Sequence, residues 1–72
     1  MPSNIKVKTW KLIGGAYTSP HMTTPMFKDY KSRIIREKLV ADFDDKNGII
    51  KIFINKDAAK HNEEKLEKLG WI

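Results

Sequence analysis

Residues 38–54, KLVADFDDKNGIIKIFI, decide the fold because they hold two apolar segments separated by a turn. Asn47-Gly48 between two such segments is the strongest short-range signal for a β-hairpin. We therefore predict strands at residues 38–44 and 49–54, joined through the polar residues between them.

The register of this hairpin follows from the two-residue period of a strand. A loop of residues 45–48 places Phe43 opposite Ile50, so the apolar side chains of both strands share one face. A loop with an odd number of residues would separate them, and an even length is predicted. The inward pairs would also include Ala41 with Ile52 and Leu39 with Ile54. The outward face would carry Lys51, Phe53, Val40 and Asp42.

Upstream, residues 4–13, NIKVKTWKLI, alternate as a third strand would. One face would carry Ile5, Val7, Thr9 and Ile13 with Lys11 among them, and the other Lys6, Lys8, Trp10 and Leu12. Burying the second face would bury two ammonium groups at several kcal/mol each. The first face is therefore expected inside, which leaves Trp10 outside between lysines.

A loop and a short basic helix are expected next. Residues 14–25 are rich in Gly, Ser, Thr and Pro, and Thr24-Pro25 is typical of an N-cap followed by the first helical position. A helix over about residues 25–37 would have its apolar stripe at Phe27, Tyr30, Ile34 and Ile35. Its remaining surface would carry Lys28, Lys31, Arg33 and Arg36.

The last element is a predicted helix over about residues 56–69, with Asn55 as N-cap and Asp57 in its first turn. Gly70 suits the left-handed position after the helix, which would let Trp71 pack near Leu66 and close the core. The chain is thus expected to be one small α+β domain, residues 1–72, in the order β-loop-α-β-β-α. A three-stranded, mainly antiparallel sheet would pack against the C-terminal helix, with the short helix as an addition.

The order of elements from Leu39 to Lys68 is similar to the end of the small archaeal chromatin proteins of the Sul7 type. The stretch consists of a hairpin with an acidic-Gly turn, then Lys56-Asp57-Ala58 and a helix containing Leu66. The resemblance implies an SH3-like barrel that binds duplex DNA with a triple-stranded sheet. It covers less than half of the chain, and no binding residue is carried over from it.

Composition restricts the class of protein. With 72 residues the chain is near the lower size at which a hydrophobic core alone holds a fold, and it has no cysteine for disulfides or thiolate metal sites. A hydrophobic fraction of 40% excludes the disordered class. The missing cysteine and the absence of a signal-peptide or transmembrane pattern favour a cytoplasmic location.

The charge is concentrated in the first half. Residues 1–40 hold eight Lys and Arg against two acids, while residues 41–72 hold six against seven. Aromatic rings among cations are typical of proteins that bind nucleic acid, because rings stack on bases and amines neutralise phosphates. We therefore expect a non-enzymatic protein that binds DNA or RNA. The expected contact residues are Lys6, Lys8, Trp10, Lys51 and Phe53 on the sheet and Lys28, Lys31, Arg33 and Arg36 on the helix.

Other interpretations stay open. The rings could belong to the core, and the basic helix could be a solvated face. The chain could also be a protein-interaction module, a small regulator or inhibitor of viral or mobile-element origin that docks on an acidic surface of a nucleic-acid-handling protein. Catalysis would rest on His21 as the general base of a small ribonuclease. No cofactor is expected, and no metal, since His61 with Asp57 or Glu64 supplies at most two ligands.

Overall fold

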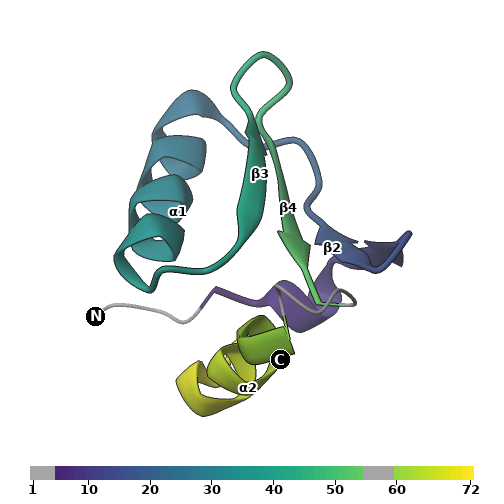
Figure 1. Cartoon of the computed structure of the whole chain (residues 1–72). Helices are drawn as coiled ribbons and strands as arrows, with labels where there is room; N and C mark the ends of the chain where they lie inside the picture. The colour runs from purple at the N-terminus through teal and green to yellow at the C-terminus, as the bar shows by residue number, and fades with distance from the viewer. Residues whose placement is uncertain (1–4, 55–59) are drawn as a thin grey trace.

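The computed structural model describes residues 5–54 and 60–72 of the chain. Figure 1 shows their elements, which are, in chain order, η1 (Val7–Thr9), β1 (Lys11–Ile13), β2 (Ala16–Thr18), α1 (Thr24–Arg36), β3 (Ala41–Asp44), β4 (Ile49–Phe53) and α2 (Lys60–Leu69). The predicted α+β class is confirmed. The predicted strand number is wrong, because the sheet within the described residues has four strands in the order β1-β2-β4-β3.

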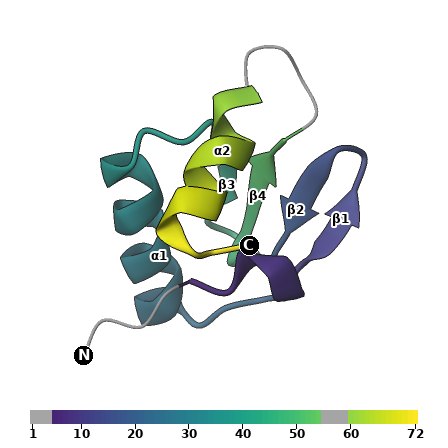
Figure 2. The ribbon, with the colours of Figure 1, turned by 90° about the horizontal axis from the view of Figure 1, so that it is seen from below.

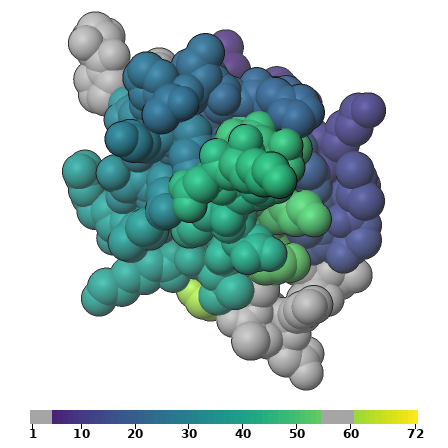
Figure 3. All heavy atoms as spheres, turned by 90° about the horizontal axis from the view of Figure 1, so that it is seen from above, coloured from purple at the N-terminus to yellow at the C-terminus, as the bar shows by residue number. Residues whose placement is uncertain are grey.

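The central hairpin of β3 and β4 has the predicted register. Phe43 pairs with Ile50, and the turn between the strands has the even length that the apolar pattern requires. Asp44 organises this turn, because its carboxylate accepts hydrogen bonds from the backbone N–H and the side-chain amide of Asn47, at 3.2 and 2.9 Å. The chain also makes a close contact here, where the N–H of Met22 donates to the carbonyl of Gly48 at 2.9 Å. Figure 3 shows the turn lying against the segment that leads into α1.

The predicted strand over residues 4–13 is wrong in its first half. Residues Val7–Thr9 form a 3₁₀ turn, in which both the backbone N–H and the hydroxyl of Thr9 donate to the carbonyl of Lys6, at 3.0 and 2.7 Å. Such local hydrogen bonds compete with a strand ladder. The turn reverses the alternation, so Trp10 is buried at 9% exposure instead of lying outside between lysines.

Residues 14–25 were expected to form a loop, but their first part forms a second hairpin. Gly14 and Gly15 have φ of 57° and 77°, which is the left-handed backbone that a two-residue hairpin turn requires. Ile13 consequently pairs with Ala16, and β2 continues the sheet by pairing with β4. The connection to α1 is therefore only residues 19–23 long.

Helix α1 lies close to its predicted bounds, although its N-cap is Thr23 and not Thr24. Phe27 and Ile34 are buried as predicted, whereas Ile35 is 56% exposed. The helix ends in a Schellman arrangement, because Lys38 has a φ of 58° and the N–H of Leu39 donates back to the carbonyl of Ile34 at 3.3 Å. This ending delays the next strand, and β3 begins at Ala41 and not at Lys38. Leu39 accordingly lies before the strand and does not pair with Ile54.

Helix α2 ends as predicted. Gly70 has a φ of 75°, and the N–H of Trp71 donates to the carbonyl of Leu66 at 2.9 Å. Trp71 is buried and its carbonyl accepts a bond of 3.0 Å from the N–H of Lys8, which ties the two ends of the described chain together. The predicted cap Asn55 and Asp57 lie outside the described residues.

The two faces of the sheet have different surroundings. On one face Ile50 and Ile52 are fully buried in a cluster with Phe27 and Ile34 of α1 and Val7 of η1. Figure 2 shows α1 beside the strands β3 and β4. Helix α2 packs against the end of the sheet, where Asn62 is fully buried. The opposite face retains exposed side chains, including Lys51 and Asp42.

Candidate nucleic-acid interface

The less covered side of the sheet, here called the open face, carries Lys11, Ile13, Thr18, Lys51 and Phe53. Strand register places these side chains in two rows, because alternate residues of paired strands point to the same side. The first row runs across the sheet through Lys11, Thr18, Lys51 and Asp42. The second row contains Ile13, Ala16 and Phe53, and the carbonyl of Val40 accepts a bond from the N–H of Phe53 at 3.3 Å beside them.

These rows combine apolar surface with positive charge. Ile13 is 58% exposed at one end of the second row, and Val40 is 38% exposed next to the half-buried Phe53 at the other end. Lys11 and Lys51 are exposed in the next row, and neither forms an ion pair with a described residue. The arrangement can therefore offer a ring and aliphatic surface for stacking, with two ammonium groups one row away.

The open face continues into a hollow of about 330 Å³ where β1 and β2 meet η1. Trp10 lines it together with Lys11, Thr18, His21 and Ile49. The imidazole of His21 is held in place, because its Nδ1–H donates to the carbonyl of Asn47 at 2.8 Å. Trp10 thus borders the open face at this hollow, but at 9% exposure it is not the exposed ring that was predicted.

Acidic side chains mark the other border of the open face. Asp42 and Asp44 on β3 line a hollow of about 290 Å³ together with Lys51. Two hydrogen bonds from Asn47 lower the pKa of Asp44 below its ordinary value. The side-chain amide of Asn47 has the larger effect and its backbone N–H the smaller one. Asp44 is therefore ionised at neutral pH, and its charge disfavours a phosphate at the β3 edge.

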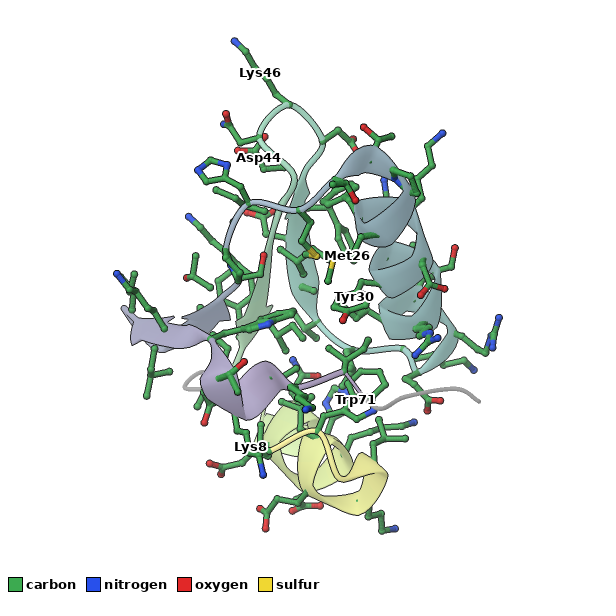
Figure 4. The ribbon with its side chains drawn as sticks, turned by 180° about the vertical axis from the view of Figure 1, so that it is seen from behind. Lys8, Met26, Tyr30, Asp44, Lys46 and Trp71 are labelled. Carbon is green, nitrogen blue, oxygen red and sulfur yellow. The ribbon has the colours of Figure 1, made fainter. Side chains whose placement is uncertain are left out.

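The predicted contact residues on the first segment do not lie on one strand. Lys6 and Lys8 are exposed, but they belong to the turn around η1, while Trp10 belongs to the core. Lys8 lies beside Trp71 near the end of α2, as Figure 4 shows. Of the predicted sheet residues, Lys51 and Phe53 are the pair that β4 brings to the open face.

The predicted helix residues divide into two kinds. Lys31 pairs with Asp45 at 3.5 Å, and its ammonium lies 5.4 Å from the ring centre of Phe43 and 5.9 Å from that of Phe27. Arg33 pairs with Asp29 at 3.4 Å. Lys28 and Arg36 are exposed on α1. Because α1 packs on the other side of the sheet, these four residues do not join the open face.

Lys11 and Ile13 are the functional candidates that the sequence reasoning missed, since both were assigned to an inward face. The signal that could have found them is Gly14-Gly15. Read as a two-residue turn, this pair predicts Ile13 opposite Ala16 and adds β1 and β2 to the sheet.

Comparison of the chain with protein-family models, with curated proteins and with solved structures gave no significant match. Within the described residues no helix is both long and apolar enough to cross a bilayer. The same residues contain no group of three or more His, Cys, Asp and Glu side chains arranged for a metal ion.

Proposed function

We propose that this protein binds single-stranded nucleic acid, without catalysing a reaction on it, through the open face. The observation that carries the proposal is the position of Phe53. Its half-buried ring lies in one row with the exposed Ile13 and next to the exposed Val40, one row from Lys11 and Lys51.

The chemistry of the face suits unpaired bases. A base that stacks on an aromatic side chain contributes roughly 1–3 kcal/mol to binding, and stacking requires bases that are free of a duplex. Lys11 and Lys51 are in position to neutralise backbone phosphates, and Thr18 between them can donate a hydrogen bond. The hollow beside Trp10 offers room at the η1 end, whereas Asp42 and Asp44 disfavour phosphate at the β3 edge. The strand would therefore cross β4, β2 and β1 and avoid β3.

Helix α1 supplies a second contact in this proposal. Lys28 and Arg36 have exposed side chains without an ion-pair partner among the described residues. A long oligonucleotide reaches them around the edge of the molecule. Mutation of these residues measures how much α1 contributes to the binding affinity.

The test is a titration of fluorescein-labelled single-stranded and duplex oligonucleotides with the protein, followed by anisotropy at several salt concentrations. We expect the single strand to bind more tightly. Lys51→Glu should weaken binding and lower the slope of log affinity against log salt concentration by about one. Phe53→Leu should weaken binding about 5- to 100-fold. Phe53→Leu keeps apolar volume while removing the ring.

Lys68→Glu is the matched control, because it makes the same charge change on an exposed position of α2. Arg36→Glu measures how much α1 contributes to the affinity for the oligonucleotide. Absence of binding at about 50 mM salt, or equal losses in Lys51→Glu and Lys68→Glu, would refute the proposed interface. The rival function, docking on an acidic protein surface, predicts a stable protein complex that nuclease treatment leaves intact.

A further inference from the structure

A second hollow, of about 390 Å³, lies on the side of the molecule where η1 faces α1. Here it is called the α1 groove, and it is lined by Lys6, Thr9, Trp10, Pro20, Met22, Met26 and Tyr30. Its volume is within the range of about 300–1,000 Å³ that is typical of ligand sites. The proposed nucleic-acid interface uses neither Met26 nor Tyr30.

The walls of the α1 groove are apolar and adaptable. Met26 and Tyr30 are four residues apart, so they form one ridge along α1 (Figure 4). Met26 is 44% exposed although the side chain is apolar. Methionine is unbranched and flexible, and it is common on surfaces that accept differently shaped apolar partners.

The polar groups of the groove favour a negatively charged partner. Lys6 is the charged residue in the lining described above, which contains no Asp or Glu. Neither the Lys6 ammonium nor the Tyr30 hydroxyl has a hydrogen-bond or ion-pair partner among the described residues. Both groups can donate to a carboxylate placed beside an apolar side chain in the groove.

We propose that the α1 groove docks a short acidic peptide segment of a partner protein. One large apolar side chain of the segment would pack against Met26, Met22 and the ring of Tyr30. An adjacent Asp or Glu would pair with Lys6 and accept a hydrogen bond from Tyr30. A nucleic acid fits the groove less well, because Trp10 is about nine-tenths buried and base stacking needs an exposed ring.

The probes are twelve-residue peptides selected by phage display from a random library on the intact chain, then synthesised with a fluorescent label. We expect the selected peptides to contain Asp or Glu next to Leu, Phe, Tyr or Trp. Their affinity, measured by anisotropy, should fall at least tenfold in Met26→Asp and several-fold in Lys6→Glu. Circular dichroism verifies that each variant is folded.

Ile35→Asp is the matched control, because Ile35 is 56% exposed and follows Met26 by nine residues, half a turn around the same helix. Amide chemical-shift mapping on the unmodified protein supplies a readout that needs no variant, and the largest shifts should fall at Lys6, Thr9, Met26 and Tyr30. The proposal is overturned by selected peptides without carboxylates, by equal losses in Met26→Asp and Ile35→Asp, or by peptide binding that Lys51→Glu abolishes. The last result would assign the peptide to the open face, whose nucleic-acid binding is measured separately.

Discussion

The side chain of Asn62 pairs with both backbone groups of Val40. Its Oδ1 accepts a hydrogen bond of 3.0 Å from the Val40 N–H, while its Nδ2 donates to the Val40 carbonyl at 2.8 Å. The same Nδ2 donates to the carbonyl of Phe53 at 2.7 Å. One fully buried amide on α2 thus satisfies the backbone where β3 begins and β4 ends.

Asn62→Ala is expected to destabilise the protein by about 2–4 kcal/mol, because each buried backbone group left without a partner costs roughly 1–3 kcal/mol. Urea denaturation followed by circular dichroism measures the change. His61→Ala, at the exposed neighbouring position, should change stability by less than about 0.5 kcal/mol. Similar losses in the two variants would contradict the role given to Asn62.

Lys38→Gly is expected to stabilise the protein by about 0.5–1 kcal/mol, because Lys38 has a φ of 58° and glycine adopts this backbone without steric cost. Ser32→Gly is the control, since Ser32 is exposed within α1 and glycine there should cost about 0.5 kcal/mol relative to serine. Thermal unfolding should shift upward for the first variant and downward for the second. A lower melting temperature for Lys38→Gly would be the opposite of this expectation.

Gly48→Ala and Gly14→Ala separate steric contact from backbone strain. Both glycines have positive φ, at 65° and 57°. A Cβ on Gly48 would lie 2.5 Å from the carbonyl oxygen of Met22, whereas a Cβ on Gly14 meets nothing within 4 Å. Gly14→Ala should cost about 1–2 kcal/mol from strain alone, and Gly48→Ala should cost at least about 1 kcal/mol more. Equal free energies of unfolding would exclude the close contact at Met22.

The pKa of Asp44 should be below the ordinary value for aspartate when carboxyl carbon NMR follows its titration. A lowered pKa in the folded state gives stability that is present above the pKa of the unfolded state, about 3.9, and is lost as pH falls through the folded value. Asn47→Ala removes the side-chain donor, so the pKa should rise toward its ordinary value. An unchanged titration in Asn47→Ala would show that another group stabilises the carboxylate.

Several features of this fold were predictable because their causes are local. The alternation of apolar and polar side chains in the two strands determined the register of the central hairpin, in which Phe43 pairs with Ile50. Asn47-Gly48 marked its turn. Gly70 followed by Trp71 predicted the helix ending, because only nearby backbone groups take part in it. The basic stretch of α1 was also visible, although its ion pairs with Asp29 and Asp45 were not.

The candidate site was predictable only in part. Lys51 and Phe53 were expected on an outward sheet face, and the strand pairing brings them to one. Trp10 was expected beside them, yet the bonds of Thr9 to Lys6 turn the chain and send the ring into the core. The hydrophobic effect favours burial of a large indole in so small a protein. This effect depends on the whole folded chain and cannot be predicted from the residues next to Trp10.

By itself, therefore, the sequence determined the turn and register of the central hairpin and the C-terminal end of α2, because these depend on hydrogen bonds and side-chain alternation over a few residues. Tertiary structure decided which face of the sheet stays open, where the α1 groove lies and what Asn62 bonds to. Those properties arise when segments far apart in the chain exclude water from a shared interior. The Asn62 amide and the Val40 backbone are 22 positions apart, and only packing brings them within 3.0 Å.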